Sequence, residues 1–165
     1  MTSALEDQFE FPQHGRVCWL AVRPARREAV IVVDGVEARV GSGLVGDRYS
    51  GRSGKREVTL IQAEHVALLA GLLGRETAVD AALLRRNIVV AGINLLALQR
   101  RTFQIGTAVL ECTGLAHPCS RMEEALGPGG WNAMRGHGGI TARVVRDGVI
   151  RLQDTVAIVA GSGVA

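Results

Sequence analysis

Aromatic side chains are scarce in this sequence, at 4% of 165 residues. Proteins that bind nucleic acid usually carry stacking aromatic residues or a strong basic stripe. Here one Tyr and three Phe accompany a net charge of only +3. We therefore expect no nucleic-acid partner, and the small basic excess favours a small anionic ligand.

Long apolar runs and paired cysteines are also missing. No stretch approaches the roughly 18 apolar residues of a membrane span, and the acidic, polar residues 1–11 do not resemble a signal or transit peptide. Cys18, Cys112 and Cys119 are too irregularly spaced for a disulfide framework. These absences predict a cytoplasmic protein without a membrane partner.

Glycine, by contrast, is abundant at 21 residues, which is typical of many short strands and tight turns. Asp34-Gly35, Gly106-Thr107 and Asp147-Gly148 each separate two short apolar segments and predict hairpins. About eight such strands favour a mainly β domain, an antiparallel sheet that closes or partly closes into a barrel. We expect a loose arm over residues 1–14 and one domain over residues 15–160.

Three or four short helices should lie at the periphery of this barrel. Apolar residues recur at helical spacing over residues 62–73, and Asp80 is the expected N-cap of a helix over residues 80–86. Ser120 and Glu123 match a capping box, in which each side chain satisfies a backbone donor of the same helix. Residues 129–139 read as a loop.

Cys119 is the most informative candidate for chemistry. It directly precedes the expected N-cap Ser120, where the helix dipole, Arg121 and a protonated His117 would all favour a thiolate. A thiolate attacks electrophiles or ligates soft metals. The alternative is a small buried residue at a strand-to-helix turn. Cys18 and Cys112 alternate with apolar neighbours and are expected in the core.

Other patterns are weaker. Cys112, His117 and Cys119 do not have a zinc-site spacing, and no second ligand pair follows them. His117 or His137 could act as a base beside the thiol. The glycines of residues 41–46 are followed by no helix, which argues against a dinucleotide site. Several arginines could clamp a phosphate, unless they are simply solvated: Arg26, Arg27, Arg48, Arg52, Arg85 and Arg86.

Seven segments, in this order, resemble the MOSC domain, named for the C-terminal domain of molybdenum cofactor sulfurase. They are residues 23–26, 43–49, 58–61, 84–88, 92–96, 114–123 and 135–143. The resemblance implies a β-barrel related to the barrel domain of pyruvate kinase, and it implies the molybdenum cofactor. Cys119 would ligate molybdenum, His117 would line the site, and the phosphate and pterin would be held by Arg26, Arg48, Arg85 and Asn87.

The chain resembles a stand-alone member of the family, in which pyridoxal phosphate is not expected. Small bacterial relatives reduce N-hydroxylated bases with electrons from separate proteins. Other members are inferred to carry sulfur on the same cysteine for metal–sulfur cluster assembly. Many members have a further cysteine where Ala116 stands here, so a dithiol relay through that position is not expected.

The leading hypothesis is a reductase of small N-hydroxylated compounds that binds the molybdenum cofactor through Cys119. A separate electron-donor protein would reduce it, and His137 or His117 would deliver protons. The rival is a carrier that receives sulfur on Cys119 as a persulfide from a cysteine desulfurase, or that passes on the cofactor. A third reading is a plain interaction domain with an empty site, which tight packing around Cys119, with no cavity, would support.

Overall fold

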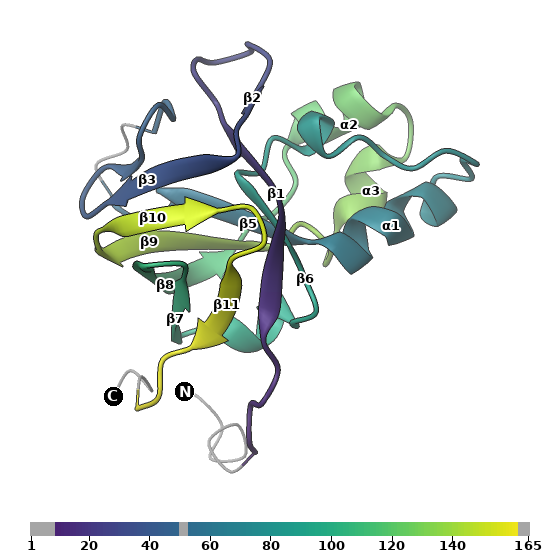
Figure 1. The fold of residues 1–165 in the computed structure, drawn as a ribbon. Coiled ribbons are helices and arrows are strands. Elements are labelled where there is room, and N and C mark those ends of the chain that lie inside the picture. Colours follow the sequence, from purple (N-terminus) through teal and green to yellow (C-terminus); the bar gives the residue numbers. More distant parts are fainter. Residues whose placement is uncertain (1–8, 50–52, 162–165) are drawn as a thin grey trace.

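Seven strands close into a barrel in this computed structural model, which describes residues 9–49 and 53–161. Around the barrel the order is β1, β11, β7, β8, β9, β5 and β6, and β6 returns to β1 (Figure 1). The strands are β1 (Gly15–Val22), β5 (Val58–Gln62), β6 (Ile88–Ala91), β7 (Thr102–Ile105), β8 (Ala108–Leu115), β9 (Ile140–Arg146) and β11 (Thr155–Ile158). The predicted mainly β barrel is therefore confirmed.

The barrel is mixed rather than purely antiparallel, because β5 and β6 run parallel. Their connection contains the helix α1 (Ala63–Leu72) and the 3-10 helix η1 (Ala81–Leu84). A crossover of this length returns the chain to the starting end of the sheet, which a tight hairpin cannot do. The expectation of an antiparallel sheet was wrong at this one pair.

Within residues 9–49 and 53–161, four short strands lie outside the closed ring. β2 (Ile31–Val32) pairs with β1, while β3 (Gly35–Arg39), β4 (Gly43–Leu44) and β10 (Gly148–Arg151) form a small second sheet. Of the three predicted hairpins, only the one at Gly106-Thr107 is confirmed, between β7 and β8. The other two are wrong, since β3 pairs with β10 and β4 rather than with β2, and β10 does not pair with β9.

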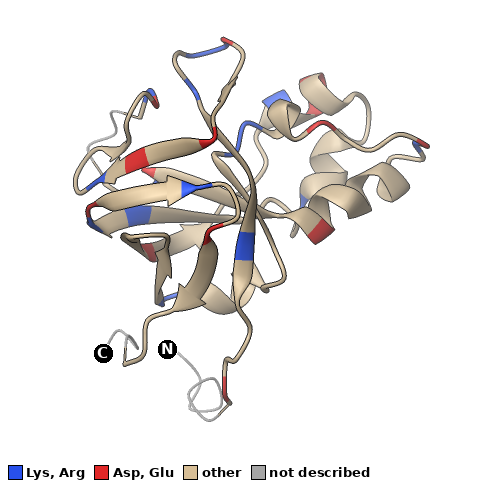
Figure 2. Cartoon of the chain, viewed as in Figure 1, with Lys and Arg blue, Asp and Glu red and all other residues tan. Residues whose placement is uncertain are grey.

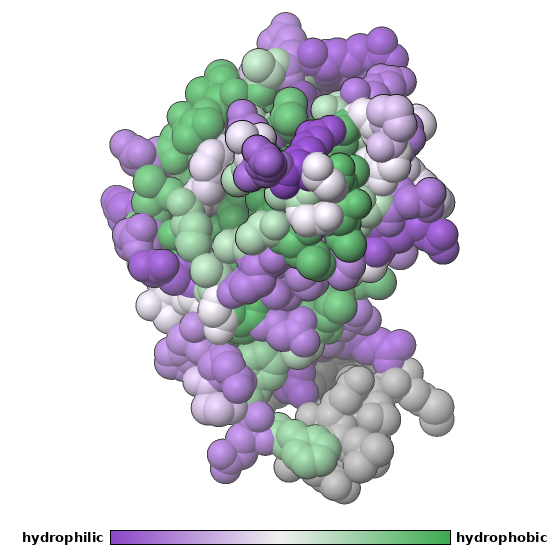
Figure 3. Space-filling view, turned by 90° about the vertical axis from the view of Figure 1, so that its right-hand side faces the viewer, coloured by the Kyte–Doolittle hydropathy of each residue, from purple (hydrophilic) through white to green (hydrophobic). Residues whose placement is uncertain are grey.

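Two apolar clusters hold the fold together. The barrel interior buries side chains such as Leu60, Ile88 and Phe103, whereas Ile61, Leu69 and other residues form a second cluster between the barrel and the helices. Strand β5 contributes to both clusters, which explains why all five of its residues are buried. The helices thus cover one side of the barrel, and Figure 3 shows this side with hydrophobic residues across its upper and central part.

The helices largely follow the sequence predictions. α1 is confirmed within a residue, and the Asp80 carboxylate caps η1 by accepting from the Ala82 backbone N–H at 2.9 Å. α2 (Ser120–Leu126) has Cys119 rather than Ser120 at its N-cap. Two described helices were not predicted, α3 (Gly130–Met134) and the 3-10 helix η2 (Leu95–Leu98). None of the helices in the described ranges is long and apolar enough to cross a membrane.

The predicted capping box is wrong, because the Glu123 side chain has other hydrogen-bond partners. Instead of returning to its own helix, the Glu123 carboxylate accepts from the backbone N–H groups of Gly129 and Trp131, each at 2.8 Å. Those donors belong to the start of α3, so Glu123 joins the two helices. The hydrogen bonds from Trp131 and Gly129 hold the pKa of Glu123 below its usual value.

Candidate functional site

A cavity of about 530 Å³ opens where loops at one end of the barrel meet the start of α2. Seven arginines line it, and no acidic side chain does so among the described residues. The lining consists of Arg23, Arg26, Arg48, Tyr49, Arg56, Thr59, Arg85, Arg86, His117, Cys119, Arg121 and Met122. We call it the arginine cavity. Its single sign of charge contrasts with the barrel strands, on which both signs are interspersed (Figure 2).

Segments far apart in the sequence supply this lining. Arg23 directly follows β1, and Arg48 follows the turn after β4. Gly46 has a φ of +91°, a conformation that glycine adopts without strain, and the turn there brings Arg48 back to β1. The backbone N–H of Arg48 then donates to the carbonyl of Arg23 at 2.7 Å. Two of the motif segments thus meet at the cavity wall.

Arg23 is held by a buried carboxylate at its base. Its Nε and Nη2 lie 3.1 and 2.9 Å from the two oxygens of Asp47, and its backbone N–H donates to Oδ1 at 2.7 Å. Burial alone would raise the pKa of Asp47, but the hydrogen bonds and charge of Arg23 outweigh it and hold this pKa below its usual value. The ion pair fixes the guanidinium before any ligand arrives.

We expect this ion pair to make stability sensitive to acid. Because the pKa of Asp47 is lower in the folded state, its contribution is complete above the unfolded pKa of about 3.9 and is lost as the pH falls through the lower folded value. Below about pH 4, Asp47→Asn should therefore lose less stability than the wild type does. Urea unfolding at pH 5, 4 and 3 measures the slope of the unfolding free energy against pH.

The matched control is Asp34→Asn, since Asp34 is exposed and its carboxylate makes none of these contacts. It should keep the wild-type slope. Equal slopes for Asp47→Asn and the wild type would contradict a role of the Asp47 carboxylate in acid sensitivity.

Asn87 does not line the cavity but holds Arg23 and Asp47 in place through hydrogen bonds. It is fully buried; its Nδ2 donates to Asp47 Oδ1 at 3.1 Å and to the carbonyl of Ala21 at 3.2 Å. Its Oδ1 accepts from the backbone and hydroxyl of Thr59, at 3.0 and 3.1 Å, and from Arg23 Nη2 at 3.4 Å. With all its polar atoms engaged, Asn87 is a positioning residue, whereas the sequence placed it against the ligand.

The arginines divide into those that hold the structure and those whose charge is available. Arg86 donates to the carbonyls of Gly138, Leu84 and Ala116, and burial with the charges of Arg23 and Arg56 lowers its pKa to about 10. Arg85 donates to the carbonyls of Glu28 and Ala25. The remaining cavity arginines make no side-chain hydrogen bond or ion pair with described residues: Arg26, Arg48, Arg56 and Arg121.

A polar atom without a partner points to a ligand. The hydroxyl of Tyr49 is buried, and it has no hydrogen-bond partner among the described residues. A buried hydroxyl left in this state costs free energy unless something binds it. Because Tyr49 lines the arginine cavity, the missing partner can come from a polar ligand there.

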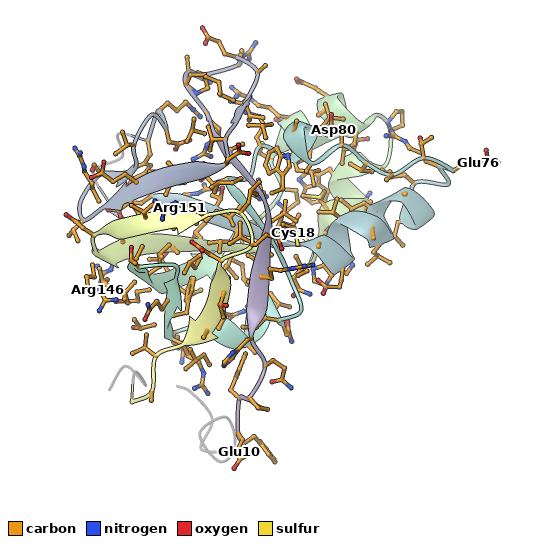
Figure 4. The ribbon with its side chains drawn as sticks, viewed as in Figure 1. Glu10, Cys18, Glu76, Asp80, Arg146 and Arg151 are labelled. Atoms are coloured by element: carbon orange, nitrogen blue, oxygen red, sulfur yellow. The ribbon has the colours of Figure 1, made fainter. Side chains whose placement is uncertain are left out.

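Cys119 and His117 lie on the α2 side of the cavity. Both are exposed, and Cys119 has φ and ψ of −104° and 173° with no hydrogen bond from its side chain into the helix. The alternative of a buried Cys119 is therefore wrong. Cys112 is a core residue, as expected, whereas Cys18 is only half-buried and packs against the helix-side cluster (Figure 4).

His137, the other candidate base, does not line the cavity. Its ring meets that of His65 edge to face, with centroids 4.8 Å apart. The glycines that follow pack against protein rather than ligand, since a Cβ on Gly139 would lie 1.8 Å from the Leu60 carbonyl oxygen. Of the other arginines considered, Arg27 lies outside the lining and Arg52 lies outside the described residues.

The sequence therefore located Arg26, Arg48, Arg85, His117 and Cys119 at one cavity. It missed the roles of Tyr49 and Arg56, and it did not single out Arg23. Two of these have a signal in hindsight, because Arg23 and Tyr49 lie inside motif segments 23–26 and 43–49. Arg56 stands outside every motif and becomes a site residue only through the fold.

The comparisons with known proteins agree with this architecture. The family model for the MOSC domain matches residues 46–157, more than half of the chain. The chain belongs to the MOSC domain family. The sequence matches no curated protein. The matched segment carries Arg48, Arg85, Asn87, His117 and Cys119, whereas Arg23 and Arg26 precede it.

Solved structures share the fold at low sequence identity. The YUAD protein from Bacillus subtilis has a TM-score of 0.75 and 17% identity, over 88% of this chain and 95% of that one. YiiM from Geobacillus stearothermophilus has a TM-score of 0.71 and 18% identity, over 90% and 78%. YiiM from Escherichia coli has a TM-score of 0.66 and 18% identity, over 88% and 70%. At these identities the likeness shows the MOSC fold alone.

The family is associated with the molybdenum cofactor, which carries a phosphate on a pterin and holds molybdenum through sulfur. The residues present fit such a group. Four arginines with available charge and the unpartnered Tyr49 hydroxyl suit an anionic, polar ligand. The exposed thiol of Cys119 supplies a soft donor in the same cavity.

Proposed function

We propose that this MOSC protein binds the molybdenum cofactor in the arginine cavity and reduces small N-hydroxylated compounds. The observation that carries the proposal is the meeting of one exposed thiol, Cys119, with seven arginines around a single cavity. When bound, the cofactor supplies a two-electron redox centre. The net reaction converts R–NHOH, two electrons and two protons into R–NH₂ and water.

Each part of the chain has a distinct task in this proposal. Arg26, Arg48, Arg56 and Arg121 bind the anionic groups of the cofactor, with Tyr49 donating one hydrogen bond. The Cys119 sulfur is the protein ligand. Asp47 holds the Arg23 guanidinium in one position through two hydrogen bonds. The guanidinium therefore does not have to reorganise when the cofactor binds.

Proton delivery falls to His117 rather than His137, because His117 lines the cavity and His137 does not. A ring nitrogen of His117 can hold a proton and release it to the leaving oxygen. Electrons come from a separate donor protein in this scheme.

The test uses wild-type protein produced in a host that makes the cofactor in excess. Metal analysis measures the molybdenum content, and reduced methyl viologen replaces the electron donor in an assay with benzamidoxime. We expect benzamidine in proportion to bound molybdenum. Cys18→Ser, a cysteine on β1 that does not line the cavity, serves as control and should retain activity.

A sulfur carrier is the second candidate, favoured by the exposure of Cys119, which a cysteine desulfurase could reach. In that case the protein would hold no molybdenum, and mass spectrometry would find a persulfide on Cys119 after incubation with desulfurase and cysteine. Molybdenum-loaded protein that reduces no member of a panel of amidoximes and N-hydroxylated bases would refute the reductase. The third reading, an interaction domain with an empty site, would be supported by tight packing around Cys119, and the cavity beside Cys119 does not give it that support.

A further inference from the structure

A second cavity, of about 620 Å³, lies beside the first. His117, Pro118, Trp131, Asn132, Arg135 and Gly136 line it. His117 lines both cavities, so it stands between the second one and the arginine cavity. A molecule reacting near Cys119 could therefore extend past His117 into this second space, which we call the tryptophan cavity.

Trp131 forms a fixed wall of the tryptophan cavity. Its backbone N–H donates to Glu123 at 2.8 Å, and its indole Nε1 donates to the carbonyl of Pro118 at 3.2 Å. Both anchors lie within four residues of Cys119 in the sequence. The side chain is still 38% exposed, so the indole is held in place while one part of it remains accessible.

Arg135 lies over this indole, with its guanidinium carbon 5.2 Å from the ring centroid. A cation over an aromatic face is attracted by the ring, and a stacked guanidinium keeps its N–H edge free for an oxyanion. Arg135 makes no ion pair or side-chain hydrogen bond with the described residues, and none of the acidic residues among them lines the tryptophan cavity. The charge is therefore positioned but uncompensated.

We propose that the tryptophan cavity binds an oxyanion of the substrate, a carboxylate or a phosphonate-like group, and that Arg135 determines this specificity. The proposal rests on the reductase function above and deepens it: the preferred substrates are anionic N-hydroxylated compounds. The N–O group faces Cys119, and the oxyanion pairs with Arg135 beyond His117. Trp131 keeps the guanidinium in place and is a positioning residue.

The kinetic test compares benzamidoxime with 4-carboxybenzamidoxime and 4-phosphonobenzamidoxime, using cofactor-loaded protein. A charge-assisted hydrogen bond predicts kcat/KM about tenfold higher for the anionic compounds, mainly through KM. Arg135→Gln should remove that advantage, so that kcat/KM becomes similar for all three compounds. Arg146→Gln removes the same charge on β9, away from α2 and α3, and should preserve the advantage (Figure 4).

A binding test separates this proposal from the proposed function. Tryptophan fluorescence of wild-type protein, titrated with 4-carboxybenzamidoxime, should report binding through Trp131, and Trp131→Phe should abolish the change although Trp19 remains. Arg135→Gln should weaken binding about tenfold. If no compound is reduced but this pattern holds, the reductase fails and the oxyanion site stands.

Two results would overturn the proposal. One is equal binding and turnover of neutral and anionic compounds by the wild type. The other is an anionic preference that survives in Arg135→Gln, which would place the oxyanion among the arginines of the first cavity. Either result leaves the reductase function intact if benzamidoxime is still reduced.

Discussion

Replacing Cys119 with serine should remove molybdenum from the protein and leave its fold unchanged. Cys119 is exposed, occupies an N-cap position and makes no side-chain hydrogen bond into α2. Serine is a favoured N-cap residue, so the local backbone should accept it. Its hydroxyl is a hard oxygen that stays protonated, whereas a soft metal prefers a thiolate. Cys119→Ser should therefore lose molybdenum binding without losing stability.

Metal analysis of wild-type and Cys119→Ser proteins from the same host measures this loss. We expect near-stoichiometric molybdenum in the wild type and a decrease of at least about tenfold in the variant, as expected for loss of a metal ligand. Thermal unfolding should give nearly equal midpoints for the apo forms. Cys18→Ser should retain molybdenum. A Cys119→Ser protein with wild-type molybdenum would eliminate Cys119 as the ligand.

Replacing Asn87 with alanine should have the largest effect on stability. The change removes every side-chain hydrogen bond at a fully buried position that joins β1, β5 and the Asp47 loop. A buried group left without its partner costs about 1–3 kcal/mol, and both the Thr59 N–H and the Ala21 carbonyl lose the Asn87 side chain, so we expect a loss of about 3–5 kcal/mol. Water entering the space would lower this figure.

Urea unfolding of the apo protein measures the loss. Asn94→Ala is the matched control, because the exposed Asn94 caps η2 with one hydrogen bond to the Leu96 backbone N–H. It should cost about 1 kcal/mol. A similar small loss for Asn87→Ala would contradict the structural role and return Asn87 to the list of ligand-binding candidates.

The sequence was informative where local chemistry decides the structure. Period-3.6 apolar residues located α1, and the Asp80 carboxylate capped its 3-10 helix as expected. The ordered motif segments brought Arg48 and Cys119 to one cavity although they are far apart in the chain. These features depend on a few neighbouring residues or on a family pattern.

The sequence was misleading where a local motif, such as a turn dipeptide or a capping box, is compatible with more than one pairing partner. The strands that Asp34-Gly35 and Asp147-Gly148 were expected to join pair elsewhere, since β3 pairs with β10. A turn dipeptide specifies a bend and not the strand that lies alongside. Glu123 has the spacing of a capping box, yet the start of α3 offers it two donors at once.

Asn87 shows why burial could not be predicted from the motif. Its position after Arg85 and Arg86 suggested a polar group facing a ligand. In the fold, β5 and the Asp47 loop close over it, and these lie 28 and 40 positions away in the sequence. Only tertiary contacts separate a residue that touches a ligand from one that supports its neighbours.

The seam between β1 and β11 has a consequence for biosynthesis. Gly15 pairs with Val156 and Arg16 with Thr155, so the first barrel strand to leave the ribosome waits for the last (Figure 1). Until then β1 and β7 each present an open edge, the kind of surface on which chains associate wrongly. Such distant pairing also slows folding. Nascent chains stalled before Thr155 should therefore be the species that chaperones hold longest.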